Sequence, residues 1–237
     1  FTIIKVENGK EAQFWRPLMQ TYHSENFERH LYKNSIGDWV IFEEKNLELN
    51  LSFFYEWRAS EKYGFVKKSW IKNHQDKTVR VEIIDGLRNI MPPGVDLRTN
   101  QSMSNLSNAY KITEYVKDAD CALFYMNSLM MDRPEPGESL FANIVWSYYN
   151  GDKSISVEEN IIKNFLENDD FKESSLKRGN PGSFIMNINT NLQPYESRQW
   201  YIVADVNKSH VDLQKFLKKK NKHKSLIEKI EDDVNNT

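Results

Sequence analysis

The stretch LELNLSFFYEWR, residues Leu47–Arg58, shows the clearest alternation in the 237-residue chain. Its odd-numbered residues are all apolar and its even-numbered residues are mostly polar. A helix would scatter the odd set around its circumference, whereas a strand places it on one face. Each large side chain buried in this way contributes about 1.5–3 kcal/mol. The pattern therefore predicts one strand over 47–57 whose core-facing residues are Leu47, Leu49, Leu51, Phe53, Tyr55 and Trp57.

Segments with strand-like patterns continue on both sides of this stretch. Short polar turns separate most of them, whereas parallel strands would need crossovers of a dozen or more residues. The Pro92-Pro93-Gly94 turn ends one run, because proline has no N–H to donate. The sequence therefore predicts a mainly β fold, a large antiparallel β-sandwich with a few helices, chiefly at the C-terminal end. The expected strands include 1–6, 14–18, 39–43, 65–73, 78–87, 109–116, 122–129, 140–148, 183–188 and 200–204.

Helical periodicity is scarce before Gly151 and then occurs in three places. Apolar residues form a helical stripe over 157–168, with Ser156 as the expected N-cap. Two more helices are expected over 210–219 and 225–234. We therefore expect a β-sandwich domain over 1–205, with a helical insertion at about 157–178. A C-terminal helical segment over 206–237 is expected to lead into a further domain of a longer polypeptide. Its apolar stripe, which must be buried somewhere, consists of Phe216, Leu217, Leu226, Ile227 and Ile230.

Composition excludes several classes of function. The net charge is −2, which gives no general attraction to nucleic acid or to an anionic membrane. The lysine-rich run over 218–224 has no interleaved aromatic residues, so it is interpreted as a solvated connection rather than a nucleic-acid site. No apolar run approaches the roughly 18 residues of a membrane span. Cys121 is the only cysteine, which excludes an internal disulfide and leaves both a cytoplasmic and a periplasmic location open.

Four stretches carry a resemblance to a known family. They are IIDGLRNIMPPGV (83–95), QSMSNLSNAYK (101–111), MDRPEPGESLFANIVW (131–146) and SRQWYIVADVNKSH (197–210). In order and wording they resemble the N-terminal, galactose-mutarotase-like β-sandwich domain of bacterial proteins similar to cellobiose phosphorylase and other glycoside hydrolases. The resemblance implies that catalysis belongs to a separate helical domain and that this chain supports or shapes its sugar site. The implied partners are a carbohydrate and that helical domain. None of the family's acidic catalytic residues has a matching position here, and no cofactor is expected.

The polar segment over 96–102 offers a candidate sugar contact. Arg98, Asn100 and Gln101 supply the amide and guanidinium groups that bind sugar hydroxyls. The competing interpretation, which we favour, is a capped loop or short helix in which Ser, Thr and Asn satisfy local backbone groups. Any contact with a sugar is expected to be weak in the isolated domain.

A second candidate is the acidic cluster of Asp132, Arg133 and Glu135, with Glu138 close by. Two carboxylates with separated pKa values are what glycoside hydrolysis requires. However, an Asp–Arg pair that braces a proline-stiffened loop is the more common arrangement, so we interpret the cluster as structural. His23 and His30, with Glu25 and Glu28, are interpreted as solvated loop residues rather than as a metal site.

Two alternative functions remain open at this point. One is a sugar epimerase of the mutarotase type, which a histidine–glutamate pair in an aromatic-lined cleft would favour. The other is a structural interaction domain without a ligand, which an exposed apolar face beside the C-terminal helices would favour.

Overall fold

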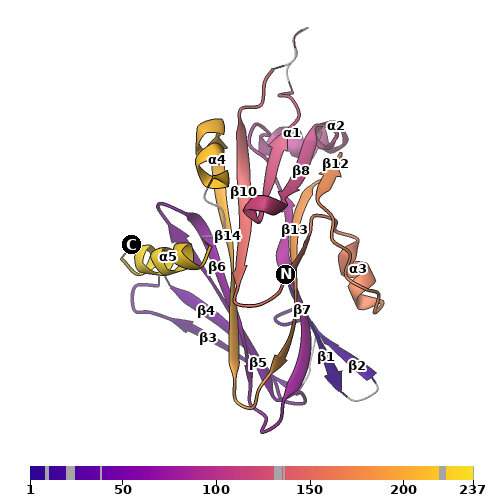
Figure 1. Ribbon diagram of the computed structural model, residues 1–237, viewed down its shortest axis with the longest axis vertical. Helices are drawn as coiled ribbons and strands as arrows, with labels where there is room; N and C mark the ends of the chain where they lie inside the picture. Colours follow the sequence, from indigo (N-terminus) through magenta and orange to yellow (C-terminus); the bar gives the residue numbers. More distant parts are fainter. Residues whose placement is uncertain are drawn as a thin grey trace.

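The computed structural model describes residues 1–8, 11–19, 25–37, 39–130, 135, 137–218 and 223–236. The strands of these residues form two antiparallel sheets, so the predicted mainly β sandwich is confirmed (Figure 1). The five-stranded sheet has the order β11 (Ser154–Ser156), β13 (Gly182–Leu192), β7 (Val79–Ile90), β1 (Thr2–Asn8) and β2 (Glu11–Trp15). The nine-stranded sheet has the order β12 (Leu176–Arg178), β8 (Lys111–Val116), β9 (Cys121–Met126), β10 (Phe141–Tyr149), β14 (Ser197–Ser209), β6 (Gly64–Asn73), β5 (Leu51–Ser60), β4 (Val40–Asn46) and β3 (Phe27–Lys33).

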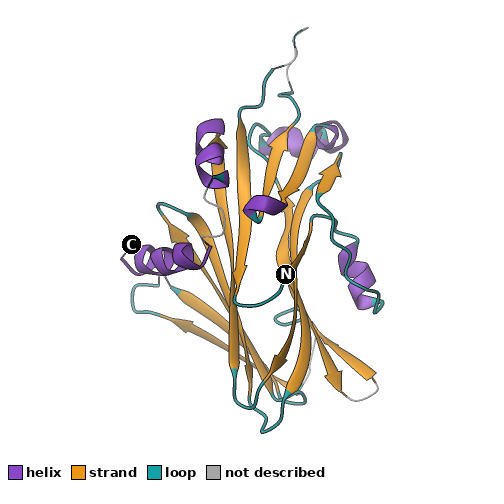
Figure 2. Cartoon of the chain, in the orientation of Figure 1, coloured by secondary structure: helices purple, strands orange, loops and turns teal. Residues whose placement is uncertain are grey.

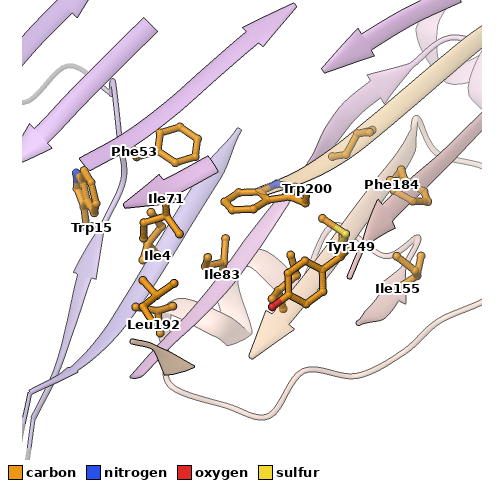
Figure 3. Packing of buried hydrophobic residues seen from close by; sticks show 14 of the residues in the cluster. Ile4, Trp15, Phe53, Ile71, Ile83, Tyr149, Ile155, Phe184, Leu192 and Trp200 are labelled. Atoms are coloured by element: carbon orange, nitrogen blue, oxygen red, sulfur yellow. The ribbon is translucent and has the colours of Figure 1, made fainter. Parts of the chain in front are cut away.

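The main hydrophobic core lies between the two sheets. Ile4 and Ile83 come from the five-stranded sheet, and Phe53, Ile71 and Trp200 come from the nine-stranded sheet (Figure 3). All five side chains are essentially inaccessible to solvent. The period-two alternation of each strand places these side chains between the sheets. Their burial is the largest stabilising term of the sandwich.

The strand predicted over 47–57 begins later than expected and continues to Ser60. Residues 47–50 form a turn, and β5 begins at Leu51. Asn50 has a φ of 48°, and the side chain of Asn46 accepts a hydrogen bond from the Leu49 N–H at 3.0 Å. Asparagine tolerates such a left-handed turn better than most residues, which explains why the alternation in the sequence extends past the strand. Leu49 is still buried in the core, whereas Trp57 is 39% exposed.

Helices cover part of the outer face of each sheet (Figure 2). The helix α3 (Ile161–Leu166) packs Ile161 and Phe165 on the five-stranded sheet. It is the helical part of the insertion expected at 157–178, and its N-cap is Asn160 rather than Ser156, which ends β11. The helices α4 (His210–Leu217) and α5 (His223–Asn236) lie on the nine-stranded sheet.

The C-terminal apolar stripe contacts this outer sheet face. Ile227 and Ile230 are fully buried there, and Phe216, Leu217 and Leu226 are partly buried against the same cluster. Two short helices, α1 (Leu97–Ser102) and α2 (Ser104–Ala109), follow β7. They lie at one end of the molecule's long axis, and the start of β5 and the end of β6 lie at the other (Figure 1).

A buried ionic cluster joins the two sheets. Asp85 on β7 is fully buried and accepts hydrogen bonds from Lys67 on β6 and from Trp200 Nε1 on β14, the latter at 2.6 Å. The hydroxyls of Thr2 and Ser69 also donate to Asp85, at 3.0 and 3.3 Å. Burial alone would raise the pKa of Asp85, but the charge of Lys67 and the hydrogen bonds from Lys67 and Trp200 hold it below its ordinary value.

Candidate functional site

The outer face of the nine-stranded sheet carries a groove beside α5. The groove has a volume of about 400 Å³, within the range of about 300–1,000 Å³ that is usual for small-molecule sites. We call it the outer-sheet groove. Its lining residues come from the segment before β4 and from β4, β5, β6 and β14: Trp39, Ile41, Glu56, Arg58, Lys68, Trp70, Ser197 and Gln199.

Strand register brings these residues together. Ile41 lies opposite Glu56, and Glu56 lies opposite Lys68 on the next strand. One step further along, Trp70 lies opposite Gln199 on β14. Because side chains alternate, the residues between these positions point into the core and the lining residues share the outer face.

Trp70 supplies a flat apolar surface to the groove. Its indole ring stacks on Phe54 of the neighbouring strand, with ring centroids 5.0 Å apart and the ring planes 5° from parallel. Phe54 covers one face of the indole, and Trp70 also lines the groove. The stack fixes the orientation of the indole ring in advance.

Trp39, Glu56 and Arg58 form a polar unit at the side of the groove. Trp39 Nε1 donates to Glu56 Oε2 at 2.5 Å, and a terminal nitrogen of Arg58 donates to the same oxygen at 3.1 Å. The guanidinium carbon of Arg58 also lies 5.3 Å from the centre of the Trp39 ring, a cation–π arrangement. Glu56 is only 5% exposed, so these contacts hold its carboxylate in one place.

The helix α5 lies next to the groove, because its Glu231 binds the groove residue Lys68. Lys68 Nζ donates to Glu231 Oε1 at 2.8 Å, and the Tyr201 hydroxyl donates to the same carboxylate. Burial and this hydrogen bond raise the pKa of Tyr201. Burial would raise the pKa of Glu231, but the hydrogen bonds from Lys68 and Tyr201 lower it below its ordinary value.

The arrangement suits binding better than proton transfer. Sugar sites combine an aromatic face with a few fixed hydrogen-bonding groups. Trp70 provides the face, and Glu56, Arg58 and Gln199 provide acceptors and donors. Trp39 and Arg58 already hold the Glu56 carboxylate in place, so it is oriented in advance as an acceptor for hydroxyl groups.

The segment with Arg98, Asn100 and Gln101 forms α1, as the short-helix interpretation predicts. Asp96 caps the helix by accepting from the Thr99 N–H at 2.8 Å. Arg98 and Gln101 are exposed, whereas the Asn100 side chain accepts from Lys111 at 2.6 Å. The contact of these residues with a sugar stays a prediction.

The acidic cluster is only partly described. Asp132 and Arg133 lie outside the described residues, and so does His23 of the histidine group. Glu135 and Glu138 are exposed, as is His30 on β3. Among the residues that the structure describes, no group of three or more His, Cys, Asp or Glu side chains is placed to hold a metal ion. Within the same residues, no helix is long and apolar enough to cross a membrane.

Sequence reasoning missed the outer-sheet groove. Glu56 and Arg58 were assigned to the polar face of the β5 pattern, and Trp70 was part of an expected strand without a functional role. The signal available in the sequence was one aromatic residue, Phe54, on the polar side of the alternation beside Glu56. A strand face that only contacts solvent does not require a large apolar side chain.

Comparison with known proteins gives likeness in fold. No protein-family model matches the sequence, and no curated protein matches it. A bacterial glucoamylase complexed with acarbose has a TM-score of 0.51 at 11% identity, over 99% of this chain and 29% of that chain. A putative kojibiose phosphorylase from the human microbiome has a TM-score of 0.46 at 11% identity, over 90% of this chain and 24% of that chain. A polysaccharide lyase has a TM-score of 0.42 at 14% identity, over 91% of this chain and 27% of that chain.

The glucoamylase likeness shows a shared fold, and the two lower TM-scores carry no argument. This chain spans less than a third of the glucoamylase, at 29%.

Proposed function

We propose that this chain is a non-catalytic, carbohydrate-binding β-sandwich domain of a larger glycoside hydrolase-like or phosphorylase-like protein. The observation that carries the proposal is the outer-sheet groove, in which Trp70 and Trp39 lie beside Glu56, Arg58 and Gln199. The fold shared with a glucoamylase that was solved with acarbose, a sugar-like inhibitor, supports a role with carbohydrates.

Binding follows from the geometry of the groove. A pyranose ring stacks on the indole ring of Trp70, where its C–H groups lose contact with water. Its hydroxyls donate to Glu56 and accept from Arg58 or Gln199. Because the Phe54–Trp70 stack and the Trp39–Glu56 hydrogen bond already hold these groups, little side-chain ordering is required on binding.

The test is titration of the chain with neutral hexasaccharides and with oligogalacturonate, followed by tryptophan fluorescence and calorimetry. The hexasaccharides are maltohexaose, cellohexaose, mannohexaose and xylohexaose. We expect at least one to bind and Trp70→Ala to weaken it at least tenfold, about 1.4 kcal/mol. Trp57→Ala is the matched control, because Trp57 lies on the adjacent strand with 39% exposure and does not line the groove. Absence of binding to every saccharide, or equal effects of the two variants, would reject the proposal.

The second part of the proposal concerns a helical domain of the same polypeptide as partner. Leu140, Phe141 and Val211 are 58%, 45% and 59% exposed. Leu140 and Phe141 line a hollow of about 270 Å³ between α4 and the β9–β10 strand ends, and Val211 follows the lining residue His210. Large exposed apolar side chains of this kind are a common feature of surfaces that contact another domain. Selective protection of this region from hydrogen exchange in the longer polypeptide, relative to this chain alone, is the expected result.

One observation favours an alternative, sugar epimerisation. The same hollow is lined by both Glu114 and His210, together with Tyr125 and Phe141. However, the Glu114 carboxylate accepts from the Tyr125 hydroxyl at 3.1 Å, and His210 contacts Gln214 on its own helix. Polarimetry of freshly dissolved α-D-glucose decides between the two functions. Acceleration that His210→Ala abolishes would establish the epimerase.

A further inference from the structure

A smaller hollow of about 70 Å³ lies next to the outer-sheet groove on the side of α5, and Glu56, Arg58 and Lys68 line both. Val66, Tyr201, Ile230, Glu231 and Val234 complete the smaller hollow. At about 10–15 Å³ for each water molecule, this space holds a few waters but no continuing sugar chain.

The helix that makes this end is firmly attached. Ile227 and Ile230 are 5% and 1% exposed on the sheet. Polar contacts on both sides add to this anchoring: Lys68 donates to Glu231 at 2.8 Å, and Ser60 donates to Asp233 at 2.5 Å. Because these two isoleucines and both polar contacts attach the helix to the sheet, α5 acts as a fixed wall rather than as a mobile flap.

Among the described residues that line the groove, none belongs to a helix that would close its opposite end. Along β14 the outward residues run from Tyr201, under α5, through Gln199 to Ser197. Ser197 is exposed and begins the strand. A saccharide bound in the groove would therefore extend past Ser197 and away from α5.

The charges of the groove are arranged in pairs. Arg58 forms an ion pair with Glu56, and Lys68 forms one with Glu231. Both cations that line the groove thus face a carboxylate of the protein, and a carboxylate on the ligand would compete with Glu56 or Glu231 for them. A neutral sugar avoids this competition, because its hydroxyls hydrogen-bond without separating either pair.

We propose that the outer-sheet groove recognises the terminal residues of a neutral oligosaccharide. The end of the saccharide lies against α5, and its other residues extend out of the groove past Ser197. This proposal rests on the carbohydrate-binding function proposed above. It adds the class of ligand, neutral rather than acidic, and the part of the chain that is bound, an end rather than an internal stretch.

Saturation-transfer difference NMR on the hexasaccharides named above tests the location of binding. We expect the strongest transfer on one or two residues at one end of the bound hexasaccharide. The corresponding trisaccharide should bind within about threefold of the hexasaccharide, because residues beyond the groove add little. Uniform transfer along the chain, or affinity that keeps rising at least tenfold from trisaccharide to hexasaccharide, would overturn terminal recognition and leave carbohydrate binding intact.

The charge of the ligand is tested separately. Oligogalacturonate is expected to bind at least tenfold more weakly than the best neutral hexasaccharide. Glu231→Gln removes the partner of Lys68 and should narrow that difference, whereas Glu135→Gln, at an exposed position away from the groove lining, should not. Tighter binding of oligogalacturonate than of every neutral hexasaccharide would overturn the neutral-ligand assignment. Absence of binding to all saccharides would instead reject the underlying function.

Discussion

Lys111 and Asn100 form a part-buried hydrogen bond that organises the amide-rich segment. Lys111 is 4% exposed, and its ammonium donates to Asn100 Oδ1 at 2.6 Å and to Asn108 Oδ1 at 2.8 Å. Burial lowers the pKa of Lys111. Of the amides that suggested a sugar contact in the sequence, Asn100 thus replaces water around a lysine, together with Asn108.

This relationship predicts a difference among the three α1 residues. Asn100→Ala removes an acceptor from a buried ammonium and should lower the free energy of unfolding by about 1–3 kcal/mol. Arg98→Ala and Gln101→Ala, at exposed positions, should change it by no more than about 0.5 kcal/mol. Urea unfolding with unchanged m-values is the measurement. Equal midpoints for all three variants would show that the Lys111 contact does not stabilise the fold.

The effects of substituting Asp85 and Lys67 on the free energy of unfolding should depend strongly on each other. Asp85→Ala leaves the Lys67 ammonium buried without its carboxylate and should cost about 3–5 kcal/mol. Combining it with Lys67→Met replaces the pair by apolar groups and should recover a large part of that loss. A thermal-unfolding double-mutant cycle measures the coupling. Strictly additive losses would contradict a direct interaction.

Stability should decrease in acid because of Asp85 and Glu231. Both carboxyls have folded-state pKa values below their ordinary values of 3.8 and 4.5. The unfolded chain therefore binds protons at these groups at a higher pH than the folded chain does. Their contribution is present above about pH 5 and is lost as the pH falls toward the lower, folded-state pKa values. Urea midpoints measured between about pH 5 and pH 2.5 should fall less steeply in Asp85→Asn or Glu231→Gln than in the unsubstituted chain, and parallel curves would contradict the assignment.

Cys121 should be unreactive in the folded protein. Its side chain is fully buried on β9, and burial raises the pKa of the thiol to about 12. A thiol-specific chromogenic reagent should label it only at the rate of unfolding, with full reaction in denaturant. Rapid labelling under native conditions would indicate local opening of the β9–β10 region.

The sequence predicted the class of fold because strand periodicity is local information. The alternation from Leu51 to Tyr55 survives in β5, and the helix at 161–166 falls within its predicted stripe. The strand β3 was missed because FERHLYK is mostly exposed on both faces, and an edge strand of this kind carries no burial pattern. Its pairing with β4 depends on a partner strand, which a single-segment pattern does not encode.

The candidate site was harder to predict, because its members come from separate strands. Only the register of β4, β5, β6 and β14 makes neighbours of the groove residues Trp39, Arg58, Trp70 and Gln199. In the sequence each has an ordinary explanation as a strand residue. By contrast, the sequence favours a capped loop or short helix over 96–102, and the segment forms the helix α1, in which Asp96 and Thr99 interact over three residues.

The position of α5 has a consequence for protein synthesis. Glu231 lies 163 residues after its partner Lys68, whereas the Trp70–Phe54 stack joins adjacent strands. Chains fold progressively as they leave the ribosome, N-terminal parts first. A nascent chain that has already paired β5 with β6 therefore presents Lys68 without its partner Glu231, and the α5 side of the groove is formed only after α5 has been translated and docked.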